Sequence, residues 1–502
     1  MTVASTTSGE IKGVETGGVI RFAGVPYAAP PTGSRRFRPP EPVAPWDGVR
    51  DASSFGPISL QNESPLNALF AEDPEPHDED CLFLNIWTPA LDGARRPVMV
   101  WIHGGGFVMG SGSTPLYQTT DFCTRGDVVL VSVNYRLGAL GFLDLSSLDS
   151  SYAESGNVGI LDQVAALRWV RDNIAGFGGD PDNVTIFGES AGGMSVATLM
   201  GTPAARGLFH KAIAQSGAAS AATTPDQVAS TALDFMRHAG VETVAELVRL
   251  PDRAILDAQG AMFIEAMANP EALAESGDPM GILPFRPVLD GEVLPRSLLD
   301  AIASGSAAGV ALMAGTTLEE WRLFDLMEPQ PVDDGVIRAR FDALTGAGGK
   351  ALDLYRSTRP GATNKELFVA LMTDLVFRIP SIRLAEAQLS HAEVYKYLFT
   401  WPTPALGGVL GSCHALELPF VFGHSRDPRL APFVGTEAPA HLQAAMQDAW
   451  MSFARNGSPS SELLPEWPCY DRERRPTMEL GDELRLLGDP GAEERRYWEA
   501  AG

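Results

Sequence analysis

The pattern GESAG at residues 188–192 combines residue types and spacing that point to chemistry. It follows a short apolar run, 184–187, and precedes residues that favour a helix, which is the context of a nucleophile elbow. The flanking glycines permit a tight turn in which Ser190 adopts a strained backbone conformation and projects its hydroxyl from the edge of a sheet. A helix that starts just after the serine offers its positive N-terminal dipole to a developing anion. We therefore predict that Ser190 is a catalytic nucleophile.

A serine hydroxyl needs a base, and the base needs an orienting carboxylate. When the serine lies on such an elbow, the order along the chain is serine, acid, histidine. A strand predicted over 310–314 leads into Glu319 and Glu320, which lie just beyond its carboxyl end. The first histidine after a strand predicted over 394–401 is His414. Position therefore predicts His414 as the base and leaves the two glutamates as alternative acids.

A glycine-rich loop supplies a third element. Residues 103–106 read HGGG and directly follow an apolar strand predicted over 98–102. Consecutive glycines leave backbone N–H groups unobstructed, as a pocket for a tetrahedral oxyanion requires. In serine hydrolases such a loop works together with the N–H of the residue after the nucleophile, here Ala191. The loop lacks the Lys-Ser/Thr pair of a phosphate-binding P-loop, so hydrolysis is the better interpretation.

The elements around these motifs alternate between strands and helices. Apolar residues recur at helical spacing between 161 and 174, and a further helix is expected after Gly192. This alternation predicts an α/β fold with a mostly parallel sheet. Helical, Ala-rich stretches near 220–300 and 330–390 are predicted to be insertions that roof a pocket within a single domain over 1–502. The expected strands are 98–102, 128–133, 184–187, 310–314 and 394–401.

Composition excludes several classes of function. The formal net charge is −25, which opposes non-specific binding to nucleic acid. No segment approaches the roughly 20 consecutive apolar residues that span a bilayer, and the N-terminus lacks the features of a secretory signal. The cysteines show neither paired nor metal-binding spacing, so we expect a reduced, cytoplasmic protein without metal or other cofactor and without a membrane partner. They are Cys81, Cys123, Cys413 and Cys469.

The sequence resembles the type-B carboxylesterase/lipase family, and specifically its bacterial para-nitrobenzyl-esterase-like members. The resemblance extends from about residue 20 to about residue 480. The stretches that carry it are FAGVPYA (22–28), EDCLFLNIW (79–87), the HGGG loop, VNYRLGALGF (133–142), the long block 156–193 and HALELPFVFG (414–423).

The resemblance implies an α/β-hydrolase fold and a carboxylic ester hydrolase that works through an acyl-enzyme. It implies Ser190 as the nucleophile and His414 as the base. In the family's G-x-x-x-[DE]-E segment the second acidic residue is the catalytic one, so the resemblance implies Glu320 rather than Glu319. The implied oxyanion hole consists of Gly105, Gly106 and Ala191, and Ser216 and Glu189 are expected beside the triad.

Two departures from the family pattern bear on redox state and substrate. Secreted members pair the cysteine of EDCL with another, but the expected position holds Ser59, so Cys81 is predicted to be unpaired. Cholinesterases carry a tryptophan ten residues before that cysteine, where this chain has Ala71. We therefore expect a small neutral ester of short or medium acyl chain as the substrate, rather than a choline ester.

Two alternatives stay open at this point. The first is a lipase that acts on esters of longer chains. The second is a non-catalytic, neuroligin-like binding protein, but such proteins lack the nucleophile that this chain retains. Either a monomer or a small homo-oligomer is compatible with the sequence.

Overall fold

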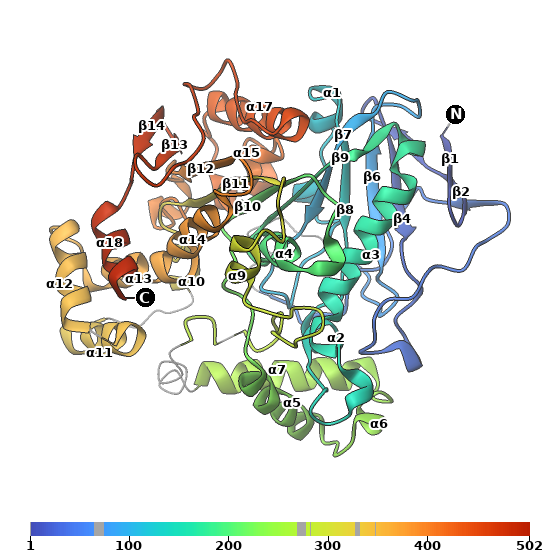
Figure 1. Cartoon of the computed structure of the whole chain (residues 1–502), viewed down its shortest axis with the longest axis horizontal. Coiled ribbons are helices and arrows are strands. Elements are labelled where there is room, and N and C mark those ends of the chain that lie inside the picture. Colours follow the sequence, from blue (N-terminus) through green and yellow to red (C-terminus); the bar gives the residue numbers. More distant parts are fainter. Residues whose placement is uncertain are drawn as a thin grey trace.

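A central sheet organises the chain (Figure 1). The computed structural model describes residues 2–64, 75–268, 278–281, 283–326, 332–346 and 348–501. Its 11-stranded sheet has the order β14-β13-β12-β11-β10-β9-β7-β8-β6-β4-β3. The strands are β3 (Val14–Thr16), β4 (Val19–Pro26), β6 (Phe83–Thr88), β7 (Arg96–Ile102), β8 (Val129–Val133), β9 (Gly179–Glu189), β10 (Lys211–Gln215), β11 (Ala311–Thr317), β12 (Val394–Phe399), β13 (Pro476–Leu480) and β14 (Leu484–Gly488).

The middle of this sheet is parallel and its ends are antiparallel. All neighbouring strands from β13 to β8 run parallel, whereas β14 and the β6-β4-β3 side are antiparallel. The predicted mostly parallel α/β sheet is thus confirmed, and each of the five predicted strands lies within or overlaps an observed one. A separate small sheet contains β1 (Val3–Thr6), β2 (Gly9–Lys12) and β5 (Val49–Asp51).

Alternating side chains of the buried strands pack into two different hydrophobic cores, one on each face of the sheet. In β7, Val98 and Val100 pack into the core that includes α3 and α4, whereas Met99 and Trp101 pack into the core that includes α17. Successive residues of a strand point to opposite faces, so an uninterrupted apolar run such as VMVWI is suited to a sheet covered on both sides.

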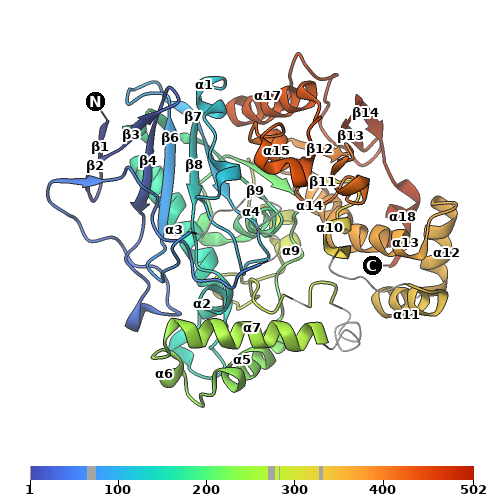
Figure 2. The same ribbon diagram turned by 180° about the vertical axis from the view of Figure 1, so that it is seen from behind.

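The helices cover both faces of the sheet and its ends. Figures 1 and 2 show α5, α6 and α7 together at one end of the molecule, with α11 and α12 at another side. The helix predicted over 161–174 is α3, and the helix expected after Gly192 is α4. The helices are α1 (Asp121–Thr124), α2 (Gly138–Phe142), α3 (Val158–Asn173), α4 (Ala191–Gly201), α5 (Pro225–Ala239), α6 (Val244–Leu247), α7 (Asp252–Ala268), α9 (Leu298–Ala303), α10 (Arg322–Asp325), α11 (Asp334–Thr345), α12 (Gly348–Thr358), α13 (Asn364–Met372), α14 (Ile379–Gln388), α15 (Leu418–Val421), α16 (Ala431–Val434), α17 (Ala440–Asn456) and α18 (Ala492–Ala501).

Part of the range predicted as a second helical insertion belongs to the sheet's own covering layer. Helix α14 packs against β11 and β12, and a π-helical turn over Thr373–Arg378 joins α13 to it. Single π-turns inside helices are frequent at functional sites.

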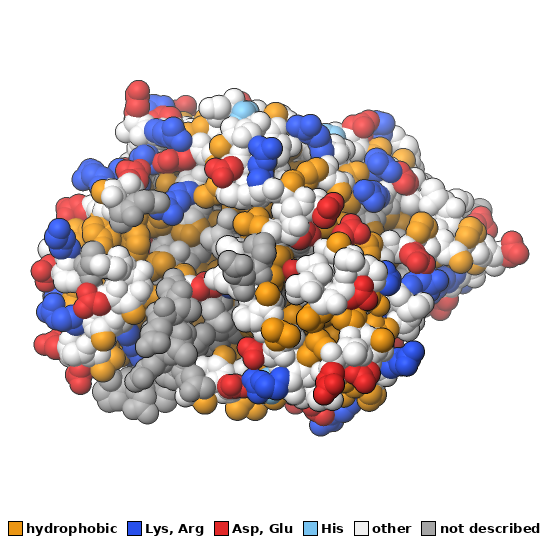
Figure 3. All heavy atoms as spheres, turned by 60° about the horizontal axis from the view of Figure 1, so that its bottom comes forward, with side chains coloured by type: hydrophobic (Ala, Val, Ile, Leu, Met, Phe, Trp, Pro, Cys, Tyr) orange, Lys and Arg blue, Asp and Glu red, His pale blue; other side chains and the backbone are white. Residues whose placement is uncertain are grey.

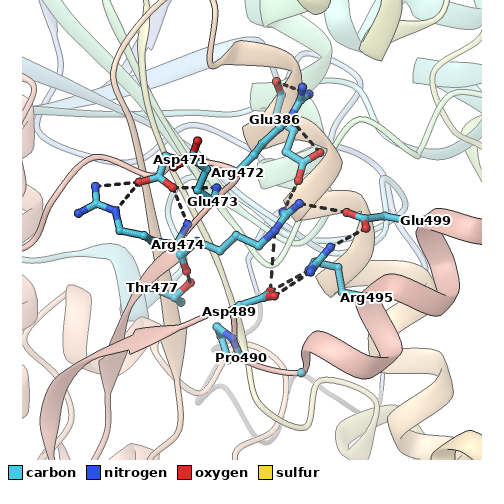
Figure 4. A network of polar contacts seen from close by, with 12 residues as sticks. Glu386, Asp471, Arg472, Glu473, Arg474, Thr477, Asp489, Pro490, Arg495 and Glu499 are labelled. Carbon is cyan, nitrogen blue, oxygen red and sulfur yellow. Dashed lines mark hydrogen bonds and ion pairs between the residues drawn. The ribbon is translucent and has the colours of Figure 1, made fainter.

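Charged side chains tie the C-terminal helix to this layer. Arg475 pairs with Glu386 of α14 and, at 3.1 Å, with Glu499 of α18. Arg495 of α18 pairs with Asp489 at 2.7 Å. Figure 4 shows how these groups converge from α14, the β13–β14 region and α18, so ion pairs join the last helix to this layer.

Candidate active site

The tight turn predicted around Ser190 lies at the carboxyl end of β9. Ser190 lies between β9 and α4 with φ 55° and ψ −124°, a backbone conformation that a non-glycine residue rarely adopts. Its N–H donates to the backbone oxygen of Gln215 at 2.9 Å, which anchors the turn to β10. The first N–H groups of α4 lie directly after the serine.

Glu320 and His414 meet across the ends of β11 and β12. His414 Nδ1 and Glu320 Oε2 are 2.6 Å apart, and both side chains are buried. The other carboxylate oxygen, Oε1, accepts from the backbone N–H of Thr317 at 2.8 Å. An ionised carboxylate only accepts hydrogen bonds, so Nδ1 carries the proton and Nε2 is left free to act as a base. Of the two glutamates that position left open, Glu320 is the one that contacts the imidazole.

The outer nitrogen of the imidazole faces a second glutamate. His414 Nε2 lies 3.1 Å from Glu189 Oε1, and it makes no hydrogen bond to the part of the chain that the structure describes. A hydrogen bond between Nε2 and Ser190 is therefore not formed here. In unliganded enzymes such catalytic hydrogen bonds are often long or poorly aligned, and they tighten only when substrate binds.

The glycine loop lies against Ser190. A Cβ placed on Gly104 would be 2.8 Å from the backbone oxygen of Glu189 and 3.2 Å from Ser190 Cβ, so only glycine allows this approach. The preceding His103 stacks on Tyr135 with ring centroids 4.5 Å apart, and the Tyr135 hydroxyl donates to the His103 backbone oxygen at 2.9 Å. Burial lowers the pKa of His103 to about 4, so its ring is neutral and serves to hold the loop.

A model of the carboxylesterase family matches residues 1–498. The chain is 41% identical to the para-nitrobenzyl esterase of Bacillus subtilis over 98% of each protein. It is 36% identical to the phenmedipham hydrolase of Pseudarthrobacter oxydans over 96% of this chain and 95% of that relative. A solved carboxylesterase of Geobacillus stearothermophilus, at pH 6.2, superposes with a TM-score of 0.88 and 40% identity over 99% of this chain and all of that one.

The chain belongs to the carboxylesterase family. This carboxylesterase has the α/β-hydrolase fold, and it is a serine hydrolase of carboxylic esters.

Two further glutamates surround the acid–base pair of this carboxylesterase. Burial, and then repulsion from Glu320, raise the pKa of Glu189 well above its ordinary value. Burial, and then repulsion from Glu189 and Glu320, raise the pKa of Glu417 to about 8. Burial and mutual repulsion therefore favour the protonated forms of Glu189 and Glu417 beside the contact between His414 and Glu320.

A polar chain that sequence reasoning missed supports Glu417. Gln215 Nε2 donates to Glu417 Oε1 at 3.2 Å, and Trp450 Nε1 donates to Gln215 Oε1 at 3.0 Å. Gln215 also holds the Ser190 N–H through its backbone, so one residue touches both the elbow and the carboxyl beside the histidine. The signals available were weak: Glu417 lies three residues after His414, and Gln215 directly precedes Ser216.

Ser216 lies close to this chain. It is fully buried with φ 45°, and its N–H donates to the backbone oxygen of Gly315 at 2.9 Å. Its hydroxyl has no hydrogen-bond partner among the described residues. The structure thus brings Ser216 to the ends of β10 and β11 without giving its side chain a contact to the triad.

Aromatic rings pack around the imidazole of His414. Phe377 of the π-helical turn and Phe324 of α10 lie 4.8 and 5.1 Å from the His414 ring, measured between centroids. Trp321 packs on Phe324 at 4.9 Å. These rings give the base an apolar boundary, and nothing in their sequence spacing marked them.

The cysteines carry no bond to one another. All four are free thiols, and Cys469 alone is exposed. Burial raises the pKa of Cys81 to about 12, and the Ser59 hydroxyl is hydrogen-bonded to its thiol. Ser59 therefore occupies the place where secreted relatives were expected to hold a second cysteine. Ala71, which bears on choline binding, lies outside the described residues.

The described ranges contain no group of three or more His, Cys, Asp and Glu side chains that could hold a metal ion. None of their helices is both long and apolar enough to cross a bilayer.

Proposed function

We propose that this carboxylesterase hydrolyses neutral esters of short or medium acyl chains through a Ser190–His414–Glu320 triad. The observation that carries the proposal is the 2.6 Å contact between His414 and Glu320, combined with the strained elbow that presents Ser190 beside the glycine loop. A nucleophile, a base and an orienting acid are the parts that acyl transfer needs.

The first half of the reaction forms an acyl-enzyme. His414 Nε2 takes the Ser190 proton while Ser190 Oγ attacks the ester carbonyl carbon. The N–H groups of Gly105, Gly106 and Ala191 bind the resulting oxyanion. Loss of one such donor costs roughly 3–4 kcal/mol in a comparable hydrolase.

Acylation is completed when the imidazolium, stabilised by Glu320, gives its proton to the leaving alcohol, which departs with the electrons of the cleaved C–O bond. The second half releases the acid. Water attacks the carbonyl carbon of the acyl-enzyme while His414 takes a proton from that water. Collapse of the second tetrahedral intermediate returns that proton to Ser190 Oγ and frees the carboxylic acid.

The aromatic wall supports an apolar alcohol group. The leaving alcohol must lie next to His414 Nε2, and Phe324 and Phe377 pack on that imidazole. The name of the para-nitrobenzyl esterase relative points in the same direction, since it specifies an aromatic alcohol. A lipase activity on longer chains is the competing function.

We also propose that the enzyme works in the reducing cytoplasm. The exposed free thiol of Cys469 and the unpaired Cys81 are compatible with that compartment. Neither thiol has a part in the proposed reaction.

Covalent labelling tests the nucleophile. A fluorophosphonate ester should modify the peptide that contains Ser190, and Ser190→Ala should lower kcat by about 10⁴-fold or more without unfolding the protein. Ser357→Ala, which changes an exposed serine of α12, is the matched control and should behave like the parent. Labelling of another residue, or a Ser190→Ala variant that keeps turnover near the parent rate, would contradict the assignment.

A substrate matrix separates the two hydrolase classes. Acyl length is varied against alcohol bulk, and each ester is measured below and above its solubility limit. We expect rates that saturate below the limit for short and medium acyl chains. A sharp rise in rate at the limit, confined to long chains, would favour the lipase.

A further inference from the structure

The glutamate that does not contact the imidazole has a contact of its own. Glu319 directs its carboxylate away from His414. Oε2 accepts from the backbone N–H of Ser412 at 3.0 Å, and Oε1 accepts from Arg322 Nε at 2.6 Å. Ser412 lies two residues before His414, so Glu319 grips the loop that carries the base.

Main-chain hydrogen bonds join the same two loops. The N–H of Glu319 donates to the Ser412 oxygen at 2.9 Å, and the N–H of His414 donates to the Glu320 oxygen at 3.3 Å. Ser412 therefore contacts Glu319 through both of its backbone polar groups. The carboxylate of Glu319 adds a side-chain link between the segment that carries Glu320 and the segment that carries His414.

Neighbouring residues leave room for this link and add to it. Gly411 has φ 53°, and a Cβ there would lie only 2.1 Å from Glu319 Oε2, so the carboxylate reaches Ser412 because residue 411 is glycine. Arg322, which holds the other carboxylate oxygen, also donates to the Val409 oxygen at 3.4 Å. Glu319 and Arg322 together thus hold the chain from 409 to 412.

Glu319 belongs to a different cavity from the triad. It lines a pocket of about 580 Å³ together with Arg322, Glu366, Thr373 and Leu398. Ser190, Glu320 and His414 are not among the described residues that line this pocket. An effect of Glu319 on turnover would therefore act through the histidine loop and not through contact with substrate.

We infer that Glu319 is a positioning residue: its carboxylate fixes the loop of His414 against the loop of Glu320 and so sets the geometry of the catalytic pair. The inference rests on the proposed triad. Both partners of the 2.6 Å contact lie beyond the ends of β11 and β12, where the Glu319 carboxylate and main-chain hydrogen bonds join their two loops. We call the hydrogen bond between the Glu319 carboxylate and the Ser412 N–H the latch. A misplacement of catalytic groups by about 1 Å can cost about 100-fold in rate, so loss of the latch can lower kcat strongly.

Three substitutions at one position separate its contributions. Glu319→Gln keeps an acceptor oxygen for Ser412 and removes the charge. Glu319→Asp keeps the charge but is one methylene too short to reach that N–H. Glu319→Ala removes both. We expect kcat to fall by about 10- to 100-fold for the alanine and aspartate variants. We expect KM to stay near the parent value for these two and the glutamine variant to keep most activity.

A control and a spectroscopic signal complete the test. Glu366→Gln changes a carboxylate of the same pocket that lies 3.8 Å from Arg322 Nη2, and it should leave kcat unchanged. The proton on His414 Nδ1, in its short hydrogen bond to Glu320, should give a low-field NMR resonance. That resonance should broaden in Glu319→Ala and Glu319→Asp, survive in Glu319→Gln and disappear in Glu320→Gln.

The outcomes distinguish the two levels of the argument. If Glu320→Gln removes activity while Glu319→Asp and Glu319→Ala keep both kcat and the resonance, the latch is wrong and the triad stands. If Glu320→Gln keeps activity, the proposed triad itself is wrong. Should Glu319→Ala fail to fold, the comparison of Glu319→Asp with Glu319→Gln still decides. A loss in Glu319→Asp alone supports the latch, whereas a loss in Glu319→Gln with activity kept in Glu319→Asp would tie the effect to charge and contradict it.

Discussion

At the scale of single residues, Glu417 makes the site sensitive to pH. Its carboxyl is fully buried and accepts from Gln215 Nε2, and the side chain of Gln215 in turn accepts from Trp450. Burial and then repulsion from neighbouring carboxylates raise its pKa to about 8. In the unfolded chain a glutamate titrates near pH 4.3. Between these values the folded protein holds a proton that the unfolded chain has lost, so stability falls as pH rises across that window and levels off above it.

Glu417→Gln should remove this dependence, because an amide mimics the protonated carboxyl. We expect the variant to match the parent in turnover at neutral pH and to gain stability relative to it between pH 5 and pH 8. Urea unfolding at both pH values measures the difference. Parallel pH dependences in the two proteins would show that Glu417 is already ionised in the fold.

What the sequence could predict at this scale depended on local pattern. Ser190, the glycine loop and His414 follow strands that the sequence reveals, so the expected order along the chain located them. Glu417 and Gln215 are 202 positions apart and meet only through the fold. Glu319 and Glu320 are neighbours of the same type, and only three-dimensional direction separates the latch from the histidine contact.

At the scale of elements, a buried ion pair joins the loop after β8 to α3. Arg136 donates to Asp162 through its backbone N–H at 3.0 Å, its Nε at 2.8 Å and its Nη2 at 2.7 Å. The side chains are 3% and 0% exposed, so neither charge has water as an alternative partner. Breaking one side of such a pair leaves an uncompensated charge, which typically costs about 3–5 kcal/mol.

Asp162→Ala should therefore destabilise the fold by about that amount, 3–5 kcal/mol, in urea titrations. Asp172→Ala is the matched control on the same helix, since Asp172 pairs with Arg171 while both side chains are about half exposed. The control should cost no more than about 1 kcal/mol. Equal losses in the two variants would mean that burial does not set the value of the pair.

Strands were predictable where apolar and β-branched residues predominate. β7, β8, β9, β11 and β12 contain such stretches, and the sequence located each of them. β10 reads KAIAQ, with a polar residue at each end, so its pattern does not resemble a buried strand even though all five residues are buried. β10 is buried because it lies between β9 and β11, and its own sequence does not indicate this position.

At the scale of the whole molecule, the net charge favours cationic substrates, whereas the groups around His414 favour neutral ones. The chain carries 63 acidic against 38 basic side chains. Figure 3 shows acidic and basic side chains interspersed on one face, so the acidic excess is spread over that face rather than gathered at one place. Such a field attracts cations from a distance, yet it provides no specific seat for one, and salt screens it over about 10 Å at 0.1 M.

Neutral esters should therefore be preferred over choline esters once this steering is screened. Burial and mutual repulsion raise the pKa of Glu189 and Glu417, which disfavours a negative charge on either, and the Glu320 carboxylate is already paired with the His414 imidazole. Among the described residues, Phe324 and Phe377 are aromatic rings next to His414, and both pack on its imidazole. A cation–π contact is worth about 0.5–2 kcal/mol, so its presence or absence would be visible in rates.

The measurement compares kcat/KM for butyrylcholine and its neutral isostere, 3,3-dimethylbutyl butyrate, at low and high ionic strength. We expect any higher kcat/KM for butyrylcholine at low salt to disappear at high salt, because only the long-range field of the protein produces it. A preference for choline above about tenfold that persists in high salt would require a fixed aromatic or anionic seat, and replacing Phe324 by Leu would then show whether that ring forms it.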